Sequence, residues 1–87
     1  EMLGGVGMTE QELKLYYSVF TSAWKFFRKY SDVKDNDEYW ENVVEESGEI
    51  VKGYENNRLS RDLILAALSE LERISKEKKV ADEEAKI

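Results

Sequence analysis

The segment 9–31 carries seven of the ten aromatic residues in this chain of 87 residues, and its apolar residues follow a helical spacing. Thr9 and Glu12 have the T-x-x-E spacing of a capping box, in which each side chain satisfies a backbone N–H at the start of a helix. At about 100° per residue, the apolar residues fall on two adjacent stripes that together cover roughly 200° of the helix surface, well beyond the usual width. Such a helix must be covered from two sides, so we expect it to organise the fold.

The two stripes are expected to have different roles. The first stripe consists of Leu13, Tyr16, Tyr17, Phe20, Trp24 and Phe27. The second stripe consists of Leu15, Val19, Ala23, Phe26 and Tyr30. The first stripe contains the more regular seam, which we expect to face the core and which consists of Leu13, Phe20, Trp24 and Phe27. The second stripe is expected to form an interface through Leu15, Val19, Phe26 and Tyr30. The remaining polar strip is expected to stay in water, and it consists of Lys14, Ser18, Thr21, Lys25 and Arg28.

A second helix is predicted over residues 37–54, with candidate N-caps in the range 35–37. Its apolar face consists of Tyr39, Trp40, Val43, Val44, Ile50, Val51 and Tyr54. The glutamates gather on the opposite face, and this separation is typical of an amphipathic helix. Ser47 falls within the apolar face, where a small residue permits close helix approach, and we expect its hydroxyl to bond back to the Val43 carbonyl. A nucleophilic role is disfavoured because no His or Lys is placed to activate the hydroxyl.

A third helix is predicted over residues 60–79, after a turn whose asparagines can adopt the left-handed conformation that ends helices. Ser60 is the expected N-cap, and Leu59 and Ile64 have the spacing of a hydrophobic staple. The inner face consists of Leu63, Ile64, Ala67, Leu68, Leu71 and Ile74, whereas Leu65 points the other way.

Together these segments predict an all-α fold, an antiparallel three-helix bundle with helices near 9–31, 37–54 and 60–79. The bundle is expected to span residues 9–80. Residues 1–8 are interpreted as a flexible leader left from cloning or, alternatively, as a short native arm. Residues 81–87 have little to bury and are expected to fray.

Composition removes several classes of function. The chain has no Cys and no His, which excludes thiolate chemistry and removes the commonest general base and metal ligand. We therefore expect no cofactor and no bound metal. No apolar run reaches the ~18 residues of a membrane span and no signal peptide is visible, which favours a cytoplasmic protein without membrane contact.

Charge is unevenly distributed along the chain. Residues 32–57 carry nine acids and two bases, within a total net charge of −6. Because nucleic-acid affinity comes mainly from neutralised phosphates, an acidic face disfavours that partner. Lys25, Arg28 and Lys29 form a small basic cluster, but cations are expected at the end of a helix. We expect the acidic surface either to keep the protein soluble or to meet a basic patch on another protein.

One segment resembles an enzyme family. The run Glu45-Glu46-Ser47-Gly48-Glu49 matches the E-E-x-x-E element of the MazG-like all-α nucleotide pyrophosphohydrolases. That resemblance implies carboxylates that bind Mg²⁺ and position a water against nucleotide phosphates. The family's second element, E-x-x-D, is missing, because Glu70-Leu71-Glu72-Arg73 places Arg where the metal-binding Asp belongs. A solvated acidic helix face is the favoured interpretation, and the pyrophosphohydrolase is kept as the alternative.

A broader resemblance spans about residues 9–75. The segments 23–30, 37–41 and 61–66 resemble small helical proteins of Firmicute prophages and conjugative elements. This resemblance implies a cytoplasmic accessory protein of a phage or mobile element, and it carries no active site whose residues can be transferred.

These observations predict a non-enzymatic protein-interaction module. The expected interaction surface consists of Leu15, Val19, Phe26 and Tyr30, with Leu65 as an outlying contact. Because the apolar arc exceeds what one helix face needs, one expectation is a homodimer in which this helix packs against its symmetry mate. The alternative is that the other two helices cover the whole arc.

Overall fold

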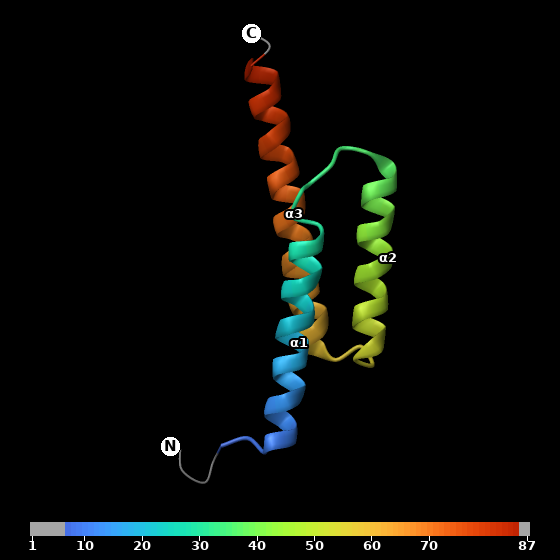
Figure 1. Ribbon diagram of the computed structural model, residues 1–87, viewed down its shortest axis with the longest axis vertical. Coiled ribbons are helices and arrows are strands. Elements are labelled where there is room, and N and C mark those ends of the chain that lie inside the picture. Colours follow the sequence, from blue (N-terminus) through green and yellow to red (C-terminus); the bar gives the residue numbers. More distant parts are fainter. Residues whose placement is uncertain (1–6, 86–87) are drawn as a thin grey trace.

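The computed structural model describes the backbone of residues 7–85 and the side chains of residues 7–81. It contains three helices, α1 (Glu10–Lys29), α2 (Asp37–Gly53) and α3 (Arg58–Ala85). Helix α2 runs opposite to α1 and α3, as Figure 1 shows, and α1 packs most extensively against α3. The predicted antiparallel three-helix bundle is therefore confirmed. The chain before residue 7, which holds most of the predicted leader, lies outside the described residues.

The starts of α1 and α2 follow the predicted capping chemistry. Thr9 Oγ1 accepts a hydrogen bond from the Glu12 backbone N–H at 3.1 Å, and Glu12 Oε1 accepts one from the Thr9 N–H at 2.8 Å. This is the complete capping box. Asn36, within the predicted range of candidates, caps α2 by accepting a hydrogen bond from the Tyr39 N–H at 2.7 Å.

The start of α3 differs from the prediction. The helix begins at Arg58, and Asn57 caps it through a 3.2 Å hydrogen bond from the Ser60 N–H to Asn57 Oδ1. Ser60 is thus not the N-cap but a buried residue of the first turn, whose hydroxyl donates to the Asn57 carbonyl at 2.7 Å. The predicted hydrophobic staple between Leu59 and Ile64 required Ser60 as the N-cap, so it does not form with the cap at Asn57. Ile64 belongs to the core instead.

The earlier start follows from the turn that precedes it. Glu55 and Asn56 both adopt left-handed conformations, with φ of 56° and 59°. Two successive left-handed residues reverse the chain within a short span, so the next residue, Asn57, is already in place to cap α3. Asn56 is left-handed, as expected of an asparagine, but the residue that ends α2 is Glu55, which directly follows the C-cap Tyr54 and was not predicted.

We expect Glu55→Gly to stabilise the protein by about 0.5–1 kcal/mol. A residue with a Cβ pays about 1–2 kcal/mol in the left-handed region, and glycine removes that strain while adding some entropy to the unfolded chain. Asn56→Gly is the matched control, with a smaller gain because asparagine tolerates this conformation. Urea unfolding measures both variants, and a loss of stability in Glu55→Gly would contradict the strain.

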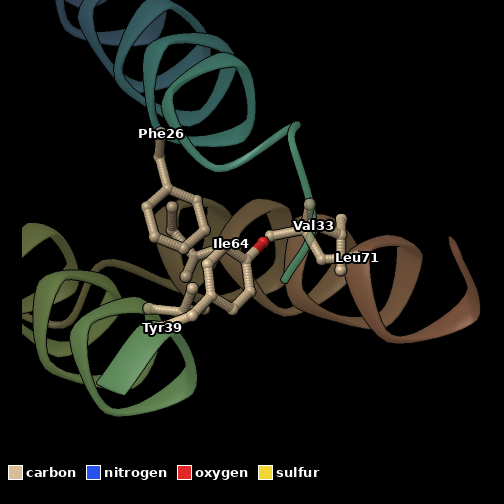
Figure 2. Packing of buried hydrophobic residues seen from close by; sticks show 6 residues of the cluster. Phe26, Val33, Tyr39, Ile64 and Leu71 are labelled. Atoms are coloured by element: carbon tan, nitrogen blue, oxygen red, sulfur yellow. The ribbon is translucent and has the colours of Figure 1, made fainter. Parts of the chain in front are cut away.

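The core brings one residue from the α1–α2 connection between the helices. Its buried cluster consists of Phe26, Val33, Tyr39, Val43, Ile64 and Leu71. Figure 2 shows the side chains of Phe26, Tyr39 and Ile64 converging, with Val33 and Leu71 beside them. Val33 lies in a connection that the sequence marks as polar, yet it is 4% exposed. The ammonium of Lys78 donates to the Val33 carbonyl at 3.0 Å, which ties this loop to α3.

A hydroxyl cluster joins the first half of α1 to the end of α2. Tyr54 Oη lies 2.5 Å from Ser18 Oγ and 2.8 Å from Ser22 Oγ, both within hydrogen-bond range. Ser18 was expected to remain in water, and its half-buried position corrects that expectation. The cluster lies on the same side of α1 as the buried Val19 and Phe26, and it fixes which side of the helix faces α2.

Helix α3 is longer than predicted. It continues past the expected end at residue 79 and reaches Ala85, so residues 81–85 are helical where fraying was expected. With 28 residues and a rise of about 1.5 Å per residue, α3 is longer than α1 or α2. Figure 1 shows the last turns of α3 extending beyond α1 and α2 at one end of the bundle, while the start of α1 extends at the other end.

Candidate interaction surface

Four large apolar side chains line the outer side of α1. We call this set the exposed seam, and it consists of Leu13, Tyr17, Phe20 and Trp24. Their exposed fractions are 55%, 74%, 54% and 57%. With spacings of four, three and four residues, they fall within about 60° of the helix circumference. Single exposed apolar residues are ordinary on protein surfaces, whereas these four form one contiguous row on a single helix.

The predicted roles of the two stripes are reversed in the structure. Val19 and Phe26 of the second stripe are 2% and 1% exposed and belong to the interior, and Tyr30 is half-buried. Only Leu15 of the predicted surface on α1 is exposed, at 43%. It lies in the first half of α1. The predicted core seam is instead largely exposed, apart from the half-buried Phe27, which packs against the core.

Small residues explain why the second stripe faces inward. Ala23 lies within that stripe, and Ser18 and Ser22 lie along its edge. Small side chains let neighbouring helices approach closely, whereas the bulky aromatic residues of the exposed seam hold a neighbour away. The hydrogen bonds of both serines to Tyr54 then fix this orientation. The regularity of the first stripe carried no such information, and the small residues were the signal that could have identified the core side.

Leu65 is 59% exposed on α3, as its position opposite the inner face predicted. It shares one edge of α3 with Glu72, seven residues later, because seven residues make about two turns. Glu72 lines an open hollow together with Trp40 of α2. Leu65 therefore lies on the α2 side of α3, so the structure does not bring it together with the exposed seam on α1.

Polar groups at the two ends of α1 carry opposite charges. Glu10 and Glu12 lie in its first turn, and Arg28 and Lys29 lie in its last turn. This distribution complements the helix dipole. Glu12 is engaged in the capping box and Lys29 bonds to α2, whereas Glu10 and Arg28 are exposed and form no ion pair among the residues whose side chains the structure describes.

A polar cluster ties the end of α1 to the acidic helix α2. The carboxylate of Glu46 accepts a hydrogen bond from the Lys29 ammonium at 2.7 Å and another from the Tyr30 hydroxyl at 2.7 Å. Burial raises the pKa of the Glu46 carboxyl, but these hydrogen bonds and the positive charge of Lys29 lower it by more, so its pKa lies below the ordinary value of 4.5. Burial is also the main cause of the raised pKa of the Tyr30 hydroxyl.

We expect Glu46→Gln to cost about 1 kcal/mol at pH 7, the usual contribution of a partly exposed ion pair with an added hydrogen bond. Because the pKa of Glu46 is lower in the folded state, its contribution is present above pH 4.5 and is lost as pH falls through the folded-state value. The difference in free energy of unfolding between the parent and the variant should therefore shrink as the pH falls below 4.5. A difference that grows on acidification would contradict the assignment.

The glutamates that resemble the pyrophosphohydrolase element do not converge. Glu45 and Glu49 are exposed on α2, while Glu46 turns back toward α1. Within the described residues, no group of three acidic side chains is close enough to hold a metal ion together. The buried Ser47 donates its hydroxyl to the Val44 carbonyl at 2.7 Å, one residue away from the predicted acceptor, Val43.

Two wider observations complete the description. Among the described residues, no helix has the length and apolar character needed to cross a membrane. Searches with the whole chain against protein-family models, curated proteins and solved structures gave no match.

Proposed function

We propose that the protein is a small, non-enzymatic helical module that binds another helix through the exposed seam of α1. The observation that carries this proposal is the row of four large apolar side chains, each more than half exposed, on one side of a single helix. An aromatic side chain offers about 150–250 Å² of surface, so the three aromatic residues of the seam leave roughly 300–450 Å² in water. That area alone is comparable to the largest apolar patch of a typical monomer, about 300–600 Å².

The spacing of the seam favours a helical partner. Anchors at positions i, i+4, i+7 and i+11 form the face that an amphipathic helix uses to pack into a groove or against another helix. Tyr17 and Trp24 supply the amphipathic aromatic surface that is enriched at binding hot spots. In the wider biological setting, we propose an accessory protein of a mobile element, which rests on the resemblance of segments 23–30, 37–41 and 61–66.

The test is capture of partner proteins from a lysate of the native host, quantified by mass spectrometry. The double variant Phe20→Glu/Trp24→Glu should lose captured proteins by at least about tenfold, because charges at two hot-spot positions abolish apolar docking. Val80→Glu is the matched control, since Val80 is 53% exposed on α3, and it should capture as the parent does. Equal capture by the double variant and the parent would contradict the proposal.

The alternative function, a nucleotide pyrophosphohydrolase, is tested by an activity assay. The assay measures the release of pyrophosphate from a panel of nucleotides in the presence of Mg²⁺. The proposal expects no release above that of a buffer control. Release that Glu45→Gln or Glu49→Gln abolishes would replace the interaction module by a pyrophosphohydrolase.

A further inference from the structure

We infer that the helix that occupies the exposed seam is α1 of a second copy of the chain, packed antiparallel. This inference rests on the proposed function, since it names the partner of the same surface. Three features of α1 support it: the symmetry of the seam, the charges at its edge and the area that it leaves in water.

The spacing of the seam reads the same in both directions. Leu13, Tyr17, Phe20 and Trp24 are separated by four, three and four residues. A twofold axis that passes between the two helices, at the level between residues 18 and 19, therefore brings Leu13 of one copy to Trp24 of the other. It also brings Tyr17 to Phe20. Each contact pairs two large apolar side chains. The central contact pairs two aromatic rings, whose mutual attraction adds to the stabilisation that comes from their buried area.

The charges at the edge of the seam are complementary under the same rotation. Glu10 and Arg28 are 18 residues apart, which is five turns of an α-helix, so they lie on the same edge of α1. Antiparallel packing brings like edges together, so Glu10 of one copy meets Arg28 of the other at both ends of the contact. A parallel twofold arrangement would instead bring unlike edges of the two helices together, so Glu10 and Arg28 would not meet. These two exposed side chains make no ion pair within the chain among the described residues, which leaves both available.

The area of the seam matches a weak but specific dimer. The smallest specific interfaces bury about 600 Å² per partner. The three aromatic side chains supply roughly 300–450 Å² of this, and Leu13 with the stems of Lys14 and Arg28 adds the rest. The first turns of α1 extend beyond α2 and α3 in Figure 1, which leaves room for a second helix along this end of the seam. We expect a dimer that forms at tens of micromolar and dissociates on dilution.

Sedimentation equilibrium of charge variants tests both the partner and its orientation. Glu10→Lys alone places two cations together at each end of the antiparallel contact, and Arg28→Glu alone places two anions together. Each variant should raise the dissociation constant roughly tenfold, because two attractive surface pairs become repulsive. An equimolar mixture of the two variants restores opposite charges at both ends and should dimerise as the parent does. Mixing leaves the fold of each chain unchanged, so a loss of helix stability cannot produce this recovery.

The outcomes separate this inference from the proposed function. A parent chain that is monomeric at 200 μM would overturn the homodimer, and capture that still depends on Phe20 and Trp24 would leave the interaction module standing. A dimer that persists in the variant Phe20→Glu/Trp24→Glu would overturn the inference, since another surface would then hold the copies together. A mixture of the two charge variants that associates no better than either alone would overturn the antiparallel arrangement.

Discussion

Replacing Phe26 by alanine is expected to lower the free energy of unfolding by about 3–5 kcal/mol, the usual cost of a large aromatic residue removed from a core. Phe26 is 1% exposed, and its side chain points from α1 into the cluster in Figure 2. The total free energy of unfolding of a native domain is only about 5–15 kcal/mol, so much of the variant should unfold on mild heating. Thermal unfolding followed by circular dichroism measures the change.

Phe20 provides the matched control for this prediction. It lies on the same helix but is 54% exposed, so Phe20→Ala should change the free energy of unfolding by about 0.5 kcal/mol or less at concentrations that keep the chain monomeric. Comparable losses in both variants would contradict the division of α1 into an inner and an outer side.

The second large effect is expected at Val33. Val33→Asp should cost about 3 kcal/mol or more, because it forces a carboxylate into a site that is 4% exposed and already lies in an acidic stretch. Val44→Asp makes the same substitution at a valine that is 63% exposed on α2, and it should cost about 0.5–1 kcal/mol, mostly from helix propensity. Urea unfolding compares the two variants. Equal costs would mean that Val33 does not anchor the α1–α2 connection.

Features that depend on neighbours in the sequence were predictable. The capping box of Thr9 and Glu12 and the asparagine cap of α2 each need only residues within one turn. The amphipathic patterns of all three helices predicted their number and order for the same reason. At the start of α3, however, Asn57 caps the helix three residues before the predicted Ser60, because the left-handed Glu55 and Asn56 reverse the chain just ahead of it.

Features that depend on distant contacts were not predictable from periodicity. Both stripes of α1 are apolar enough to be buried, and the choice between them was made by contacts such as that of Ser22 with Tyr54, 32 residues away. Val33 stands alone among polar residues, so no pattern marked it as part of the core. The width of the apolar arc did indicate a surplus of apolar surface on α1. Which part of the arc stays exposed depends on how all three helices pack, so the sequence pattern alone did not predict it.

The most direct test of the exposed seam is the accessibility of Trp24 in a Trp40→Phe variant, which leaves one tryptophan in the chain. Acrylamide quenching is measured at submicromolar concentration, where the chain is monomeric. Because Trp24 is 57% exposed, we expect strong quenching and emission near that of free tryptophan in water, with a blue shift as concentration rises. A shielded, blue-shifted tryptophan at the lowest concentration would place Trp24 in the core and contradict the account.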